Sequence, residues 1–371
     1  MTVKTASRKQ KAVSSAAHRS LLAANYIMPA EWECQEAVWL GWPHYADDWP
    51  CKLNQARWAY CEMIRNITRV QKVRMLVQDK KTKANALSFL EKAHVSLDNV
   101  EFFEVKTNRG WLRDAGPSFV RATPSYTSPL GGGKGGGKAM IDWKFNAWAK
   151  YKNWPLDNTI PSFIQKYLGY ERIVPTHNGR QVVLEGGSID VNGKGVLLTT
   201  EECLQSNVQC RNPGFTKDDY LEVFGKYLGI KEIIWLGDGI KGDDTHGHVD
   251  DIARFINVGT IAAAVETDKK SDNYAQSQEN LKRLRRTKYS VVELPMPKPI
   301  YFDGVRLPAS YANFLIINKM VLVPIFGDAN DRHGLNALAD AMPNHEVVGI
   351  YAADLVVGLG TIHCLTQQEP L

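Results

Sequence analysis

A cysteine near the end of this chain stands where a thiol could act in chemistry. Cys364 follows a loop broken by Gly358 and Gly360, which permit a tight backbone and the close approach of a substrate. A thiolate is the nucleophilic form, and a free thiol with a pKa of about 8.5 needs a nearby base, cation or N–H group to ionise. The adjacent His363 would point the other way in an extended loop, so a different histidine must handle protons. A buried cysteine in a final strand is the alternative that these residues leave open.

The segment from Asp243 to Asp251 is dense in histidine and aspartate. In an extended strand, His246, His248 and Asp250 would share one face, because positions two apart point the same way. Zinc hydrolases use such HxHxD spacing, although a metal site would need further ligands on later loops. Alternatively, His248 is a general acid/base and Asp250 binds the substrate. A polar surface turn is the third interpretation.

Two further carboxylates precede glycine-containing turns. Asp114 lies in the aromatic stretch Trp111–Pro117, and Glu185 ends the apolar run 182–184. A carboxylate at the end of a buried strand is usually paired or functional. A guanidinium group is planar, always charged, and matched by carboxylates. One thiol, one histidine and three carboxylates would therefore suit a deiminase: two carboxylates hold the guanidinium, and the third orients the imidazole.

The elements that must position these residues form a repeat of hairpin, helix and strand. The hairpins are predicted at 188–191 with 196–199, 253–256 with 261–264, and 313–317 with 320–323, with a looser copy at 118–121 with 139–143. Helices are predicted at 55–70, 216–228, 274–286 and 334–341, and strands at 72–78, 231–236, 289–294 and 346–350. A strand at Val38 is interpreted as the remnant of a fifth copy. Such a long period predicts an α/β array of five units whose loops meet at one mouth.

Composition limits the classes of protein that remain. The chain has 371 residues, 44% of them hydrophobic, and a formal charge of +5. We expect residues 1–27 to be a disordered basic tail or a targeting segment and residues 28–371 to be a single catalytic domain. No apolar run is long enough for a membrane span, and no nucleic-acid motif is present. The expected location is the cytoplasm, with organelle targeting by the basic, acid-free start left open.

Two further sequence features have plain explanations. The six cysteines form no CxxC pair, which favours free thiols in a reducing compartment, and five of them can be explained as small buried hydrophobic residues. The glycine-lysine insert Gly131–Lys138 approaches a phosphate-binding loop. However, Ala139 stands where a magnesium-binding hydroxyl is needed, so a flexible hairpin tip is predicted.

Five motifs, WLRDAGP, EGGSI, DTHGHVDD, ASYANFLIINKMVLVP and GLGTIHCLTQQEP, resemble those of the agmatine deiminases, a peptidylarginine deiminase-like family of the pentein superfamily. The likeness runs from about Met28 to Pro370. It implies a five-bladed α/β propeller of ββαβ units. It also implies hydrolysis of agmatine to N-carbamoylputrescine and ammonia in polyamine synthesis, with no metal and no cofactor.

By motif, the resemblance also implies a role for each of six residues: the nucleophile Cys364, the general acid/base His248, its partner Glu185, the guanidinium clamp of Asp114 and Asp250, and Trp111 lining the pocket. The thiolate would attack the guanidinium carbon and leave an amidino-cysteine intermediate, which water then hydrolyses. Leu359 and Thr361 stand where the family has glycine and asparagine, which bears on substrate preference.

Alternative functions are a peptidylarginine deiminase, a metal-dependent hydrolase built on His246, His248 and Asp250, and a polyamine-binding protein without catalysis. The expected partner is a small cationic substrate, and neither nucleic acid nor membrane is expected. The sequence leaves the choice between a monomer and a homodimer open.

Overall fold

The structure is a computed structural model and describes residues 25–123 and 137–371. Most of the predicted tail and the predicted tip of the glycine-lysine insert lie outside the described residues. The last residues assigned to the tail form strand β1 (Tyr26–Ile27), which pairs with β5 (Ser118–Ala122). Within the described part of the chain, no helix is long and apolar enough to cross a membrane.

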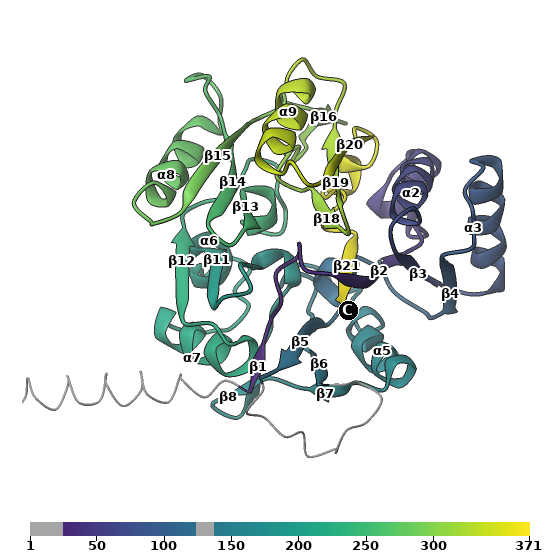
Figure 1. The fold of residues 1–371 in the computed structure, drawn as a ribbon, viewed down its shortest axis with the longest axis horizontal. Helices are drawn as coiled ribbons and strands as arrows, with labels where there is room; N and C mark the ends of the chain where they lie inside the picture. Colours follow the sequence, from purple (N-terminus) through teal and green to yellow (C-terminus); the bar gives the residue numbers. More distant parts are fainter. Residues whose placement is uncertain (1–24, 124–136) are drawn as a thin grey trace, which may run out of the picture.

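Five sheets share one topology, in which an antiparallel pair is extended by a parallel strand. Their strands are β5, β6 (Lys138–Ile141) and β7 (Glu171–Ile173); β10 (Asp190–Val191), β11 (Val196–Thr200) and β12 (Glu232–Leu236); β13 (Ala253–Asn257), β14 (Thr260–Val265) and β15 (Ser290–Pro295); β18 (Leu315–Ile317), β19 (Met320–Ile325) and β20 (Glu346–Tyr351); and β21 (Thr366–Pro370), β2 (Gln35–Gly41), β3 (Lys72–Val77) and β4 (Val100–Glu104). Figure 1 shows the sheets grouped around a common centre. The predicted hairpins and their following strands are confirmed.

The interpretation of the strand at Val38 as a remnant is wrong. Strand β2 pairs antiparallel with the C-terminal strand β21, with Val38 opposite Gln368. The two ends of the chain therefore complete one sheet together. Because β21 is the first strand of that sheet, the Cys364 loop precedes it as the other functional loops precede β5, β10 and β13.

Helices connect the strands and pack on the outer parts of the sheets (Figure 1). The longer ones are α2 (Leu53–Ile67), α3 (Lys80–Lys92), α5 (Ile160–Leu168), α7 (Lys217–Leu228), α8 (Tyr274–Leu284) and α9 (Asp331–Ala341), so all four predicted helices are confirmed. Helix α7 begins with a capping box, in which Thr216 and Asp219 exchange side-chain and backbone hydrogen bonds. It ends at Gly229, whose φ of 75° suits a residue without a side chain.

Short elements lie between these. They are the helices α4 (Leu112–Ala115) and α6 (Glu201–Gln205), the strands β8 (Thr176–His177), β9 (Arg180–Gln181), β16 (Tyr301–Phe302) and β17 (Val305–Arg306), and the 3-10 turns η1 (Ala46–Asp48), η2 (Asp157–Thr159), η3 (Gly186–Ser188), η4 (Val249–Asp251) and η5 (Val356–Gly358). Three of them, α4, η3 and η4, contain or adjoin the predicted site residues.

The buried apolar residues form two clusters. The larger one includes fully buried aromatic side chains such as Trp39 and Phe255, each worth roughly 1.5 to 3 kcal/mol on burial. Cys364 belongs to the same cluster. The prediction that the other five cysteines are buried is wrong for Cys34 and Cys51, which are exposed. Cys61 and Cys203 are buried as predicted.

Candidate active site

Five loops, each preceding the first strand of a sheet, bring polar side chains to the centre of the molecule. They carry Asp114 before β5, Glu185 before β10, His248 and Asp250 before β13, Asn313 before β18, and Cys364 before β21. All six side chains are buried. A buried charge needs a partner, so a cluster of buried carboxylates around a thiol points to a cationic ligand.

The thiol of Cys364 is fixed by Asn313. The Asn313 amide nitrogen donates to Cys364 Sγ over 3.1 Å, and its amide oxygen accepts from Thr361 Oγ1 at 2.8 Å. That oxygen also accepts from the backbone N–H of His363 at 3.1 Å. One asparagine therefore ties the loop together and turns a donor toward the sulfur. Thr361, the position that departs from the family, is part of this arrangement.

Asp250 is supported from behind by two other buried groups. Its Oδ2 lies 3.5 Å from Cys364 Sγ and 2.7 Å from His363 Nδ1. His363 Nε2 lies 2.9 Å from Glu31 Oε2, which also accepts from Arg254 at 2.8 Å. Both nitrogens of the ring therefore face a carboxylate oxygen at hydrogen-bonding distance. His363 thus contacts the site instead of pointing away from it.

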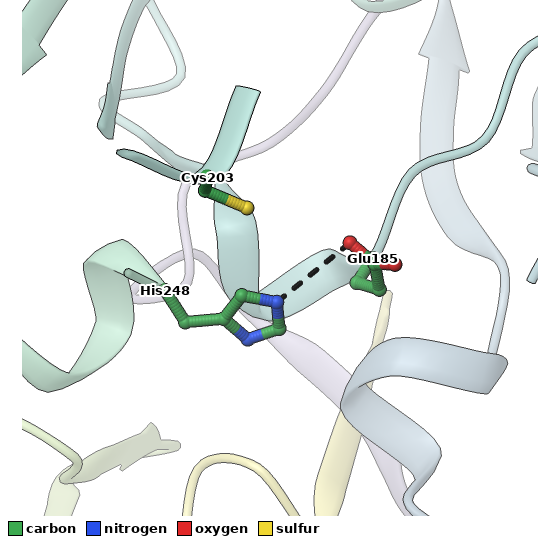
Figure 2. Close-up of side chains that lie close together, drawn as sticks. All are labelled: Glu185, Cys203 and His248. Atoms are coloured by element: carbon green, nitrogen blue, oxygen red, sulfur yellow. Dashed lines mark ion pairs between the residues drawn. The ribbon is translucent and has the colours of Figure 1, made fainter. Parts of the chain in front are cut away.

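His248 lies between two carboxylates without a hydrogen bond to either. Its Nδ1 is 3.8 Å from Asp114 Oδ1, and its Nε2 is 3.7 Å from Glu185 Oε2 (Figure 2). Both ring nitrogens are buried and have no hydrogen-bond partner. Glu185 is held on its far side by Arg211, whose Nε lies 3.2 Å from Oε1. The imidazole therefore has charged neighbours at both nitrogens and freedom to hold or release a proton.

Gly187 marks the point where the two sides of the site meet. A Cβ placed there would lie 2.5 Å from His248 Nδ1, 2.9 Å from Asp114 Oδ1 and 3.1 Å from Asp250 Oδ2. The backbone N–H of Gly187 donates to Asp114 Oδ1 over 3.0 Å. No other residue type fits at this position. The two aspartates and the histidine therefore converge on one small volume beside the thiol.

The residues around the thiol favour its protonated form. Burial and then the nearby carboxylates of Asp250, Asp251 and Asp114 raise the pKa of Cys364 well above its ordinary value. Burial likewise raises the pKa of Asp114 to about 6. A cation bound between the carboxylates would offset this negative field and favour the thiolate.

The pKa values of His248 and Asp250 are shifted in the directions that favour the charged form of each group. Burial lowers the pKa of His248, but Asp114, Cys203 and Glu185 outweigh it and raise the pKa well above its ordinary value. Burial raises the pKa of Asp250, but the hydrogen bond and charge of His363 hold it below its ordinary value. The site therefore combines an imidazolium with an ionised carboxylate next to the thiol.

The predicted alignment of His246, His248 and Asp250 on one strand face is wrong. Residues 249–251 form the 3-10 turn η4, and His246 has a left-handed φ of 68°. His246 Nε2 instead lies 3.0 Å from Ser206 Oγ, away from the other two residues. Among the described residues, the groupings with metal-ligand spacing around the site do not include His246. The structure gives no support for the proposed HxHxD ligand set.

Two cavities lead from the surface to the thiol. A small inner cavity of about 20 Å³ is lined by Trp111, Asp114 and Cys364, among others. It adjoins an outer cavity of about 760 Å³, and both are lined by Arg109, Gly358 and Leu359. Leu359 has a left-handed φ of 67°, a conformation that favours glycine. A ligand that moves from the outer cavity to the thiol passes between Arg109 and Leu359.

Trp111 lines the inner cavity and is fixed by its surroundings. Its ring stacks on Trp49 with centroids 5.4 Å apart, and its Nε1 donates to Asp48 Oδ2 over 2.9 Å. Asp48 also accepts from Arg109. The guanidinium of Arg109 lies 4.2 Å from the ring centroid of Tyr151. These contacts make the rim of the inner cavity a preorganised aromatic wall.

Sequence reasoning did not identify four groups in contact with the site. These are Asn313 and Asp251 near the thiol, Arg211 behind Glu185, and Cys203 beside His248. Asn313 had a usable signal, because it precedes its sheet as Asp114, Glu185 and Asp250 precede theirs. The other three become neighbours of the site only through tertiary packing.

The comparisons with known proteins show which family this chain resembles. The family model "Porphyromonas-type peptidyl-arginine deiminase" matches residues 27–370. The agmatine deiminase of Medicago truncatula is 34% identical, covering 93% of this chain and 96% of its own. The solved agmatine deiminase of Enterococcus faecalis has a TM-score of 0.82 and 31% identity, covering 94% and 98% of the two chains. An agmatine deiminase of C. jejuni with substrate bound has a TM-score of 0.80 and 32% identity, covering 93% and 96%. These likenesses show an α/β pentein fold.

Proposed function

We propose that this chain, which belongs to the Porphyromonas-type peptidyl-arginine deiminase family, hydrolyses the guanidinium group of agmatine to N-carbamoylputrescine and ammonia. The observation that carries the proposal is the convergence of Asp114, Asp250 and His248 on Gly187, with Asp250 3.5 Å from the thiol of Cys364. Relatives named as agmatine deiminases, one of them solved with its substrate bound, support agmatine as that substrate.

Substrate binding is the first step. The guanidinium would lie between the carboxylates of Asp114 and Asp250, which match its charge and its planar donors. Asp250 Oδ1 is buried without a hydrogen-bond partner and is therefore free to accept from a substrate N–H. The positive charge of the guanidinium then lowers the pKa of Cys364, and the thiol passes its proton to solvent water, because His248 already carries the proton that the next step uses.

Attack of the thiolate on the guanidinium carbon is the second step. A sulfur–carbon bond forms, and Asn313 keeps the sulfur in position through its amide N–H. His248 Nδ1, which faces Asp114 and Gly187, gives its proton to the departing nitrogen, so the carbon–nitrogen bond breaks and ammonia leaves. An amidino-cysteine and a neutral His248 remain. Glu185 next to Nε2 holds the ring in place during this transfer.

Hydrolysis of the intermediate is the third step. Neutral His248 takes a proton from water, and the resulting hydroxide attacks the amidino carbon. The sulfur–carbon bond breaks, which releases the ureido product and restores the thiol. Overall, one water is consumed and one ammonia is formed for each agmatine. The experiment that tests this function is the release of ammonia and N-carbamoylputrescine from agmatine by the pure protein, and the absence of both would overturn it.

Deimination of arginine in peptides is a second candidate function. The outer cavity of about 760 Å³ favours it, because that space is larger than the short chain of agmatine needs. The name of the matching family model also refers to this activity. Parallel assays of agmatine and of a short peptide containing arginine separate the two, since ammonia from the peptide alone would identify the second function.

Three finer statements remain predictions. We infer that the five sheets form the blades of a five-bladed propeller, which their repeated topology around one centre supports. The second prediction is that the protein forms a homodimer, which the mass of the protein in solution would test. The exposed apolar side chains of Tyr301 and Val305 give such an interface a place to form. The third is the cytoplasmic location of the protein, which a fluorescent fusion would test.

A further inference from the structure

We propose that Cys203, His248 and Glu185 form a binding site for Zn²⁺ and that zinc held there inhibits the enzyme. The three side chains offer a sulfur, an imidazole nitrogen and a carboxylate oxygen, the three donor types that zinc accepts in proteins. Their ligand atoms all lie within 4.8 Å of one another. The inference rests on the proposed function, because inhibition follows from the role given to His248.

The geometry of the group suits one small ion. Figure 2 shows Cys203 Sγ and the Glu185 carboxylate on the side of the imidazole that carries Nε2. Nε2 and Glu185 Oε2 are 3.7 Å apart. Zinc with bonds of about 2.0 to 2.3 Å in a tetrahedron holds its ligand atoms roughly 3.3 to 3.8 Å apart. One pair therefore already has this separation, and the sulfur of Cys203 lies within 4.8 Å of both other ligand atoms.

The two ring nitrogens of His248, which have no hydrogen-bond partner, are an independent observation that points to a ligand. Both are fully buried and lack hydrogen-bond partners, which is costly for a polar group. Nδ1 faces Asp114 on the substrate side of the ring, so its role in the proposed reaction explains why it has no hydrogen-bond partner. Nε2 faces Glu185 and Cys203 at distances too long for a good hydrogen bond to Glu185. A metal ion between these three groups would satisfy Nε2 directly.

Cys203 is held in place by a contact with the loop of His248. It lies in α6, whose N-cap residue Thr200 accepts from the Cys203 backbone N–H over 3.0 Å. The Thr200 hydroxyl in turn donates to the carbonyl oxygen of Gly247 over 2.5 Å. Thr200 thus joins the helix of the thiol to the residue preceding His248. The spacing of the two ligands is built into the fold and does not depend on a flexible loop.

The carboxylate of Glu185 can bind zinc beside Arg211. Arg211 Nε lies 3.2 and 3.3 Å from the two oxygens of Glu185, and Oε2 also lies 3.7 Å from His248 Nε2. A carboxylate has about four acceptor positions, so Glu185 can keep its contact with Arg211 and coordinate zinc as well. Zinc would bind the neutral imidazole of His248 and the thiolate of Cys203, and the displaced protons leave to solvent.

Bound zinc would prevent turnover because it occupies the imidazole of His248, although zinc itself takes no part in the reaction. With Nε2 coordinated, His248 cannot be the imidazolium that protonates the departing ammonia. All three ligand residues are buried, so zinc must enter the interior of the protein to reach them. We therefore expect slow-onset inhibition that a chelator reverses.

A spectroscopic titration tests the site without reference to activity. Co²⁺ added to the full-length Cys364→Ala variant is expected to give a thiolate-to-cobalt charge-transfer band, saturating at one ion per chain and abolished by Zn²⁺. The band should disappear in the double variant Cys364→Ala/Cys203→Ala. It should persist in the double variant Cys364→Ala/Cys61→Ala, a control at another buried cysteine. The absence of the band, or its survival without Cys203, would overturn the proposal.

Two further measurements keep the result decisive. If Cys203→Ala fails to fold, Cys203→Ser replaces it, because a serine hydroxyl gives no such band. Inhibition is measured in proteins that retain Cys364. There, the Zn²⁺ concentration for half-inhibition should rise at least about tenfold in the Cys203 variant and stay constant in Cys61→Ala. An unchanged value would assign inhibition to another thiol. Ammonia release without metal tests the proposed function separately, so its failure is distinct from a failure of the zinc site.

Discussion

The two sides of the guanidinium clamp differ in how fully their polar groups are hydrogen-bonded. On the Asp250 side, Asp250, His363 and Glu31 are joined by hydrogen bonds of 2.7 and 2.9 Å. On the His248 side, the imidazole lies 3.7 and 3.8 Å from Glu185 and Asp114 and has no hydrogen bond. Both sides are buried and contain one histidine and two carboxylates.

The difference separates positioning from proton transfer. The Asp250 side is fixed before substrate arrives, so it can hold the guanidinium near the thiol at no further cost of reorganisation. The His248 side is incomplete, and its imidazole must alternate between charged and neutral forms during the reaction. The ring of His363 is fixed by two short contacts with carboxylates, so it cannot reorient toward a substrate. The looser histidine is therefore the one suited to acid/base work.

Exchanging each histidine for glutamine should give the largest contrast. His248→Gln is expected to lower kcat about 10²- to 10⁴-fold with little change in Tm, because acid/base catalysis is lost and few contacts are broken. His363→Gln should instead lower the free energy of unfolding by about 3 to 5 kcal/mol, because two buried carboxylates lose the partner that both of them contact. Ammonia assays and thermal unfolding measure both effects. Equal losses of kcat with unchanged Tm in the two variants would contradict the comparison.

A methyl group added at Gly187, where the two sides of the clamp meet, should have the next largest effect on activity. Gly187→Ala places a methyl group against His248, Asp114 and Asp250, so we expect kcat/KM to fall about 10²-fold or more. Gly259→Ala is the matched control, since its nearest neighbour would be 3.8 Å away and its φ is not left-handed. Steady-state kinetics with agmatine compare the two variants. Similar kinetics for both would show that the convergence at Gly187 has no role.

The raised pKa of Asp114 predicts a dependence on pH. Because its folded-state pKa is about 6, the stability that it contributes is present below about pH 4 and is lost as pH rises through about 6. Ionised Asp114 is needed to bind a cation, so KM for agmatine should fall over the same interval, by up to about tenfold per pH unit.

The variant Asp114→Asn should remove both trends. Its Tm relative to the unmodified protein is expected to rise from pH 4 to pH 7, by the equivalent of up to about 3 kcal/mol, while agmatine binding is weakened throughout. Thermal unfolding and KM measured across this pH range check the prediction. A KM that keeps its pH dependence in the variant would assign the titration to another group.

Widening the passage to the thiol should have the smallest effect. Leu359→Gly relieves a left-handed backbone strain of about 1 kcal/mol and removes a side chain shared by both cavities. We expect kcat/KM for a peptidyl arginine to rise several-fold relative to that for agmatine. Lys319→Gly, at a similar φ of 59° in the β18–β19 turn, is the control. An unchanged ratio would remove Leu359 from the determinants of substrate choice.

Local patterns predicted much of the fold and located the main side chains. The hairpins around β10, β13 and β18 have alternating apolar residues and short turns, so their existence follows from sequence. The pairing of β2 with β21 does not, because Val38 and Gln368 are far apart in the chain and carry no local signal of pairing. The 3-10 turn at 249–251 replaced a predicted strand for a similar reason. Its shape is set by Asp243, whose carboxylate accepts from the backbone N–H groups of Gly247 and His248.

The difference in hydrogen bonding between the two sides of the clamp could not be predicted from the sequence either. Glu31 and His363 are separated by 332 positions, and neither belongs to a stretch that suggests an ion pair. Whether a buried histidine is locked or loose depends on distances of a few tenths of an ångström. Residue types and spacing predict that His248 is present in the site, whereas its missing hydrogen bonds are a property of the packed structure.

The most direct test of the central claim is a rapid-quench intact-mass measurement of the protein during turnover of agmatine. The account predicts a species heavier by the mass of agmatine less one ammonia, located on Cys364 by peptide mapping and formed as ammonia is released. It should be absent in Cys364→Ala. Ammonia release with no adduct on Cys364, or an adduct on another cysteine, would contradict the account.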